Sequence, residues 1–160
     1  MAVIPLPDFK QKMVQIGYLA RTANLLGIAT PKIACIAPSE QLLPNVISST
    51  EGALLAKMAD RGQLGNVVVD GPLSLDVALY KEVAEHKKVK GSSVAGDPDC
   101  LLFPNLESAN VFFKSVSHLC GGELAAMVMG TKVPCVLTSR GDTSKTKLFS
   151  IALACLAVKK

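Results

Sequence analysis

The chain has few aromatic residues, few arginines and no long hydrophobic run, and each shortage excludes a class of protein. Aromatic side chains make up 4% of the 160 residues and tryptophan is absent, so the core has to be aliphatic. Only three of the 17 basic residues are arginines and the net charge is +4, which suits a small anionic ligand better than nucleic acid. The longest apolar run, 151–158, is far below the roughly 20 residues that span a bilayer.

Two further absences concern location and metal binding. The first residues have neither the basic start nor the apolar run of a secretory signal, and we expect a cytoplasmic protein with no membrane partner. No two cysteines have CxxC spacing, which argues against a zinc site or a disulfide framework. Each cysteine lies in an apolar run, so we expect small buried side chains in a reducing compartment at Cys35, Cys100, Cys120, Cys135 and Cys155.

What the sequence does contain is an alternation of helical and strand patterns. Apolar residues recur at helical spacing from Asp8, which forms a capping-box pattern with Gln11, to Gly27. Further helices are predicted from a capping box at Ser48 and Glu51, from Ser74 to the basic segment 86–90, from Asn105 to 121–122, and from 142–143 onward. Short apolar runs predict strands at 32–37, 66–70, 100–103, 124–129 and 134–138. This alternation predicts an α/β fold with a mostly parallel sheet flanked by helices.

Two details of the pattern concern the ends of elements. Gly71-Pro72 follows the second apolar run and predicts a break in the chain directly after that strand. The last helix is apolar on nearly every side from Leu148 onward, which predicts deep packing.

The segment Thr138–Asp142 is the sharpest candidate site. In open α/β sheets, ligands bind in the loops that leave the carboxyl ends of the strands. Here a predicted strand runs into Thr-Ser-Arg-Gly-Asp-Thr-Ser and then into a helix. Hydroxyls, a guanidinium and the free N–H groups of a helix N-terminus together form a phosphate or oxyanion site. The alternative is that Asp142, Thr143 and Ser144 only cap the helix.

The other polar loops have plain structural explanations as well. The triplet 70–72 fits a tight turn, Asn105 fits a helix cap, and Asn110 and Lys114 fit a helix surface. The two histidines, 86 and 118, lie near helix ends without a serine or cysteine partner at a telling distance, which argues against a catalytic triad. The glycine-rich motifs of nucleotide-binding proteins are absent.

Three ordered segments resemble one family together. Residues 67–78, 92–115 and 134–152 are similar to the phosphate acetyl/butyryltransferase family, and more to its butyryl branch than to its acetyl branch. The resemblance implies acyl transfer between coenzyme A and inorganic phosphate on a two-domain fold similar to isocitrate and isopropylmalate dehydrogenases. It covers only the C-terminal half of such a protein. Residues 1–138 would resemble the second domain, and 139–160 would form the active-site loop and a C-terminal helix that packs on the N-terminal domain.

The resemblance also implies roles for individual residues. Ser139 would hydrogen-bond a phosphoryl or carbonyl oxygen, and Arg140 would pair with phosphate or with the coenzyme A diphosphate. The aspartate that the acetyl branch carries seven residues after its motif serine is Thr146 here, so we assign the general base to Asp142 as a hypothesis. Further phosphate or coenzyme A contacts are expected from Thr138, Lys114, Asn110 and Asn105, and shaping of the cleft from Asp70, Gly71, Pro72, Asp76 and Gly96.

Three functional hypotheses follow. The first is a phosphate acyltransferase for butyryl or a similar short acyl group, with coenzyme A as a substrate, no bound cofactor, no metal and no nucleic acid partner. The second is a truncated, non-catalytic domain of that family that binds coenzyme A or phosphate or serves in assembly. The third is a phosphate acetyltransferase. Family precedent and the apolar last helix predict a homo-oligomer, most simply a dimer.

Overall fold

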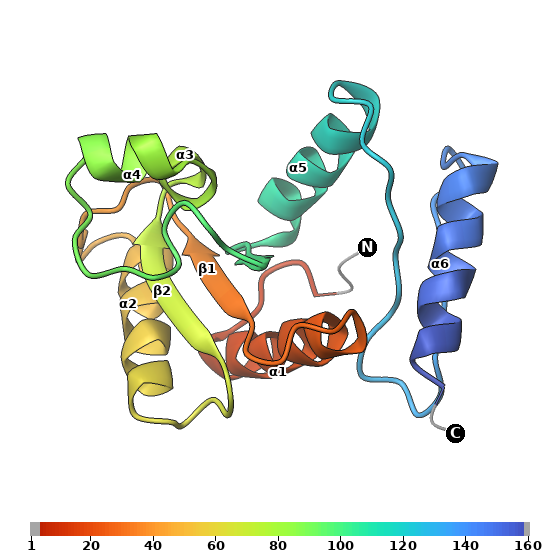
Figure 1. Ribbon diagram of the computed structural model, residues 1–160, viewed down its shortest axis with the longest axis horizontal. Coiled ribbons are helices and arrows are strands. Elements are labelled where there is room, and N and C mark those ends of the chain that lie inside the picture. The colour runs from red at the N-terminus through yellow and green to blue at the C-terminus, as the bar shows by residue number, and fades with distance from the viewer. Residues whose placement is uncertain (1–3, 159–160) are drawn as a thin grey trace. The chain divides into compact units, whose positions relative to one another are not determined.

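The computed structural model describes residues 4–158. It divides into two compact units (Figure 1). Leu6–Pro104 forms the first, called the sheet unit here. The chain from Asn105 onward forms the second with Ile4 and Pro5, and is called the loop unit. The predicted division at 138–139 concerns the domains of longer relatives and stays a prediction.

The sheet unit is built on three parallel strands in the order β2-β1-β3. They are β1 (Lys32–Ile36), β2 (Val68–Leu73) and β3 (Cys100–Leu102), which confirms three of the five predicted strands. In the central strand every residue except Lys32 is buried, as expected of a parallel strand covered on both faces.

The predicted break at Gly71-Pro72 is wrong, because β2 continues through both residues to Leu73. Since β2 lies at the edge of the sheet, a proline there removes no hydrogen bond to a further strand. The pairing of β1 with β2 is irregular at this point, between Ala34 and Ile36.

The first two helices confirm one predicted capping box and overturn the other. Helix α1 (Phe9–Leu25) has the box between Asp8 and Gln11. Helix α2 (Ile47–Asp60) has its N-cap at Val46 without a side-chain cap. Ser48 and Glu51 therefore lie inside α2, and Glu51 forms an ion pair with Lys12 instead of a capping bond.

The helix predicted from Ser74 to the basic segment is interrupted. It forms α3 (Leu75–Leu79) and α4 (Lys81–His86), separated by Tyr80 in an extended conformation. The backbone N–H of Gly96 donates to the Ala78 carbonyl at 2.9 Å. In a continuous helix the Ala78 carbonyl would accept the backbone N–H of the residue four positions later. Here the N–H of Gly96, in the loop after α4, takes the place of that helical donor.

Two apolar clusters cover the two faces of the sheet. Alternate residues of β1 point to opposite faces, so Ile33 and Cys35 belong to one cluster and Ala34 and Ile36 to the other. The first cluster adds buried residues from α1, α2, the other strands and the position just before β2, namely Ile16, Leu55, Val67, Val69 and Leu102. The second adds Leu73, Val77, Ala78, Ala84 and Val94, largely from α3, α4 and their loops.

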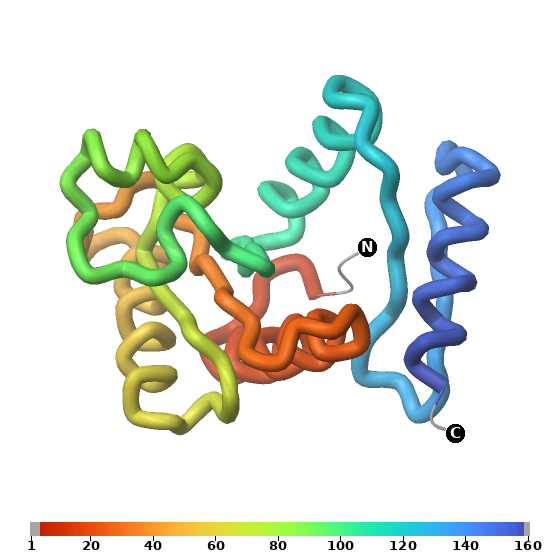
Figure 2. Tube along the Cα trace, in the orientation of Figure 1, coloured from red at the N-terminus to blue at the C-terminus, as the bar shows by residue number. Residues whose placement is uncertain are grey.

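The loop unit holds two helices joined by a long extended segment. They are α5 (Leu106–His118) and α6 (Ser144–Leu156), and their side-chain caps are Asn105 and Thr143. Figure 2 shows the joining segment as an extended path from the end of α5 to α6. The strands predicted at 124–129 and 134–138 are wrong: residues 119–143 contain only the antiparallel bridge between Val128 and Cys135. A strand needs a neighbouring strand that forms hydrogen bonds with its backbone N–H and C=O groups. This segment pairs in that way only at Val128 and Cys135.

Helix α6 is not deeply packed, which overturns that prediction. Leu148, Ile151 and Leu156 are 62%, 55% and 57% exposed. The buried side chains of α6 are the polar Thr146 and Ser150, and the Ser150 hydroxyl accepts the Ala126 N–H at 2.9 Å. The helix therefore packs on the joining segment through hydrogen bonds and leaves apolar side chains uncovered.

The cysteines do not share one environment. Cys35 is buried and Cys100 is half-buried, whereas Cys120, Cys135 and Cys155 are exposed. The prediction of burial is thus wrong for the three in the loop unit, because the apolar runs around them are not enclosed by a sheet. No helix within residues 4–158 is both long and apolar enough to cross a membrane.

Candidate functional site

Four predicted site residues line one cavity in the loop unit. Asn110 and Lys114 come from α5, and Ser139 and Asp142 come from the turn before α6. The cavity measures about 150 Å³. Its remaining wall is apolar and consists of Leu106, Ala109, Phe113, Ala126 and Leu137.

The turn from Ser139 to Asp142 is closed by two hydrogen bonds. The Ser139 backbone N–H donates to Asp142 Oδ2 at 2.7 Å, and the Asp142 N–H donates to the Ser139 carbonyl at 3.1 Å. The Asp142 side chain is only 8% exposed, and Lys114 Nζ lies 3.7 Å from its Oδ1. The same ammonium lies 5.1 Å from the centre of the Phe113 ring. The carboxylate is therefore held in place and its charge is compensated.

Helix capping does not account for Asp142. The N-cap of α6 is Thr143, whose hydroxyl accepts the Thr146 N–H at 3.1 Å. Thr146 is buried, and its carbonyl accepts the Ser150 hydroxyl at 2.7 Å. The residue at the acetyl-branch acid position thus belongs to the cap of α6, whereas the nearby carboxylate of Asp142 faces a cavity.

The remaining residues of the predicted loop differ in exposure. Ser139 Oγ accepts the Gly141 N–H at 3.4 Å. Arg140 is exposed, lies outside the cavity lining, and forms no ion pair within residues 4–158. Thr138 is half-buried. Asn105 caps α5 by accepting the Ser108 N–H at 2.9 Å, which is the structural role considered for it from the sequence.

A second cavity of about 240 Å³ also reaches Asp142 and is lined mainly by polar residues and glycines. Its lining includes Thr143, Lys145 and Thr146 of the capped turn, His118 at the end of α5, and Glu123 beyond that helix. Lys145 and Glu123 form an ion pair across it. The sequence placed His118 only at a helix end, and its spacing gave no sign of this second cavity.

The residues expected to shape the cleft belong to the sheet unit, where two glycines have steric roles. A Cβ atom on Gly71 would lie 2.6 Å from the Cys35 Cβ. A Cβ on Gly96 would lie 2.5 Å from the Lys81 Cα, and Gly96 has a φ of +81°. Only glycine fits such contacts and such a φ without strain. Pro72 is buried, and the Asp70 carboxylate accepts the Gly71 N–H at 2.7 Å.

Asp76 joins a charged group after the carboxyl ends of β1 and β2. Its Oδ2 lies 3.0 Å from Lys87 Nζ, which also lies 3.5 Å from Glu40 Oε2. Hydrogen bonds from Ser74 and then Lys87 lower the pKa of Asp76 to about 2. The bond to Asp76 correspondingly raises the pKa of Lys87. This group fastens the loop after β1 to α3 and α4.

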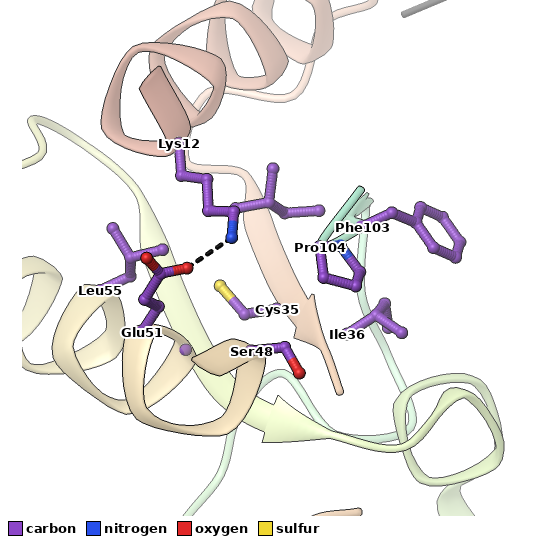
Figure 3. Close-up of a pocket in the computed structure, with 10 residues that line it drawn as sticks. Lys12, Cys35, Ile36, Ser48, Glu51, Leu55, Phe103 and Pro104 are labelled. Carbon is purple, nitrogen blue, oxygen red and sulfur yellow. Dashed lines mark hydrogen bonds and ion pairs between the residues drawn. The ribbon is translucent and has the colours of Figure 1, made fainter. Parts of the chain in front are cut away.

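Sequence reasoning missed the ion pair between Lys12 and Glu51 (Figure 3). Their side chains are 6% and 17% exposed and reach toward each other from α1 and α2. The spacing could have indicated that Lys12 is buried, because it precedes the buried Ile16 by one helical turn and so lies on the same face of α1. The adjoining cavity of about 10 Å³ admits nothing larger than a water molecule.

Cys35 lies beside this pair and faces the same small cavity. Burial raises the pKa of its thiol to about 12, so the thiol is not a reactive nucleophile at neutral pH. Within residues 4–158, three or more acidic, histidine or cysteine side chains nowhere gather into a possible metal site.

Comparison with known proteins places these features in a family. Residues 1–155 match the phosphate acetyl/butaryl transferase family. The chain is 43% identical to a phosphate butyryltransferase of Clostridium acetobutylicum, over 94% of this chain and 50% of the relative. It is 40% identical to a phosphate acetyltransferase of Thermotoga maritima, over 92% of this chain and 50% of the relative.

Solved structures agree with the sequence relatives. A branched-chain phosphotransacylase from Enterococcus faecalis V583 superposes with a TM-score of 0.88 at 30% identity, covering 97% of this chain and 55% of that chain. The chain spans about half the length of the curated relatives that it matches. The family match covers nearly all of it, and the chain therefore belongs to the phosphate acetyl/butaryl transferase family.

Proposed function

We propose that this chain carries a phosphate acyltransferase site, which moves a butyryl or similar short acyl group between coenzyme A and inorganic phosphate. The observation that carries the proposal is the buried carboxylate of Asp142, held beside Lys114 and Ser139 in a cavity with an apolar wall. Family membership supports the same chemistry.

Acyl transfer needs a proton acceptor for the coenzyme A thiol, since a free thiol has a pKa of about 8 to 9 and reacts as the thiolate. In the proposed step the proton passes from sulfur to the Asp142 carboxylate, and a bond forms between sulfur and the acyl carbon. The bond from that carbon to the phosphate oxygen then breaks, and phosphate leaves with its electron pair. Release of coenzyme A follows the same steps in reverse: a phosphate oxygen attacks the thioester carbon, the bond from carbon to sulfur breaks, and Asp142 returns the proton to sulfur. Lys114 and the Ser139 N–H hold the base in position for this transfer.

The developing negative charge on oxygen needs donors. The Ser139 hydroxyl accepts a bond from Gly141 and retains its own proton for a phosphoryl or carbonyl oxygen. Arg140 is exposed, and its planar guanidinium suits bidentate pairing with phosphate or the coenzyme A diphosphate. Thr138, Asn105 and Asn110 are proposed as supporting polar contacts.

The wider assignments belong to the same proposal. They are a cytoplasmic enzyme, a homodimer, a two-domain fold similar to isocitrate and isopropylmalate dehydrogenases, and a boundary at 138–139 between the second domain and the returning segment. Asp70, Gly71, Pro72, Asp76 and Gly96 would shape the cleft from the sheet unit. Coenzyme A is a substrate in this scheme, and the steps require neither a metal nor a covalent enzyme intermediate.

A non-catalytic role is the second candidate, because the chain spans half the length of its relatives. Free coenzyme A released from butyryl- and acetyl-coenzyme A, with and without phosphate, separates the candidates. We expect phosphate-dependent release by the purified protein, faster with butyryl-coenzyme A. Binding of coenzyme A without release would favour the non-catalytic role, and faster release from acetyl-coenzyme A would favour a phosphate acetyltransferase.

A further inference from the structure

The apolar wall of the 150 Å³ cavity comes from two sides. Leu106, Ala109 and Phe113 recur at three- and four-residue spacing on one face of α5. Ala126 and Leu137 come from the joining segment. Asp142, Ser139 and Lys114 line the same cavity, so the proposed reacting groups adjoin this apolar wall.

The size and lining of this cavity favour an acyl chain over a charged group. An apolar cavity of about this volume is large enough to take up benzene, so a four-carbon acyl chain fits. A phosphate or diphosphate placed against the five apolar side chains would lose hydration that those residues cannot replace, since the donors of this lining are Asn110, Lys114 and Ser139. The second cavity on Asp142 is lined by Thr143, Lys145 and Thr146 instead of an apolar wall, and it offers a charged group a cation and hydroxyls.

Ala126 lies in the extended joining segment, but a hydrogen bond to α6 fixes its backbone. Its backbone N–H donates to Ser150 Oγ at 2.9 Å. Ser150 is fully buried, and its hydroxyl donates in turn to the Thr146 carbonyl. The Ala126 methyl group is therefore held at a set place by α6.

We infer that Leu106, Ala109, Phe113, Ala126 and Leu137 form the acyl-chain subsite, with Ala126 and Phe113 setting the length of chain that fits. This inference rests on the proposed function and names its specificity residues. The small side chain of Ala126 leaves room for a chain longer than acetyl, and the Phe113 ring limits further growth.

The first test is Ala126→Leu, which adds three carbon atoms to the cavity wall. A methylene in an apolar pocket changes discrimination about 10- to 200-fold. We expect kcat/KM for butyryl-coenzyme A to fall at least tenfold more than kcat/KM for acetyl-coenzyme A. The matched control is Ala125→Leu, which adds the same volume at the exposed neighbouring position and should leave the ratio unchanged. Thermal unfolding of both variants reports whether they fold.

The second test enlarges the cavity. Phe113→Ala should raise kcat/KM for hexanoyl-coenzyme A relative to butyryl-coenzyme A, the opposite direction from Ala126→Leu. Phosphate-dependent release with an unchanged preference in both variants would overturn the subsite and leave the proposed function standing. Absence of phosphate-dependent release from every acyl-coenzyme A by the unaltered protein would overturn the proposed function, and the subsite with it.

Discussion

The two units of this molecule differ in what they bury. In the described residues, every buried apolar side chain lies in the sheet unit, from Ile16 to Leu102. The buried side chains of the loop unit are Thr146 and Ser150, both polar. The residues with the clearest chemistry, Asp142, Ser139 and Lys114, all lie in the loop unit. Stability is thus concentrated in one unit and the proposed chemistry in the other.

In the loop unit, the turn from Ser139 to Asp142 is held by hydrogen bonds instead of by a buried apolar core. The Asp142 carboxylate closes its own turn, Thr143 caps the following helix, and Ser150 fastens that helix to the joining segment. Directional hydrogen bonds fix positions more narrowly than apolar contacts do, which suits a site that has to orient reacting groups.

The largest expected effect on stability is at the Lys12–Glu51 ion pair of the sheet unit. Lys12→Met leaves Glu51 as an uncompensated charge that is mostly buried, and removal of one partner of a buried pair costs about 3–5 kcal/mol. Urea unfolding measures the loss. The double variant Lys12→Met/Glu51→Leu should recover much of it. A single variant as stable as the unaltered protein would show that the pair is solvated.

A pair of leucine truncations compares the two units directly. Leu55 is 1% exposed in the sheet unit and Leu148 is 62% exposed in the loop unit. Leu55→Ala should lower the free energy of unfolding by about 2–5 kcal/mol, and Leu148→Ala by no more than about 0.5 kcal/mol. Urea unfolding again measures both. A similar loss at Leu148 would mean that another surface covers α6.

In the loop unit, Arg140→Ala should affect binding and not folding. The guanidinium is exposed, so its loss leaves the unfolding temperature unchanged. Loss of a charge-assisted hydrogen bond is worth about 1.5–3 kcal/mol, which corresponds to a rise in KM for phosphate of at least about tenfold. Lys147→Ala, an exposed cation of α6 outside both cavities, is the control. An unchanged KM for phosphate would leave Arg140 without the proposed role.

The smallest expected effect is the pH dependence that Asp76 gives to the sheet unit. Its pKa falls from 3.8 to about 2 on folding. A lowered pKa in the folded state contributes stability above the unfolded-state value, and that stability is lost as the pH falls from about 4 to about 2. Asp76→Asn should flatten the pH dependence of the unfolding temperature in this range. Because Asp76 is half exposed, the change is small, and an unaltered slope would contradict the assignment.

Sequence patterns predicted those elements whose signals are local. The capping box at Asp8 and the caps at Asn105 and Thr143 depend on a few neighbouring residues. The apolar run of β1 identified a strand covered on both faces. Of the seven residues expected to act in catalysis or in phosphate or coenzyme A binding, Asn110, Lys114, Ser139 and Asp142 line a single cavity, whereas Asn105, Thr138 and Arg140 lie outside its lining.

The failures occurred where a distant partner decides the outcome. The apolar runs at 124–129 and 134–138 resemble strands, but pairing occurs only at Val128 and Cys135. Glu51 fits a capping box in its local sequence, but its carboxylate forms an ion pair with Lys12, 39 residues away. Periodicity within one segment carries no information on such partners, which is also why the apolar pattern of α6 did not reveal its exposure.

The most direct test of the central claim, that Asp142 in the loop unit is the base for acyl transfer, is the turnover of Asp142→Asn. Asparagine keeps the shape and can still accept the Ser139 N–H, but it can neither take up a thiol proton nor, in the release direction, return one to the departing sulfur. We predict that phosphate-dependent release of coenzyme A falls by about 10²- to 10⁴-fold while the urea unfolding midpoint stays close to that of the unaltered protein. A folded Asp142→Asn protein with unchanged kcat would contradict the account.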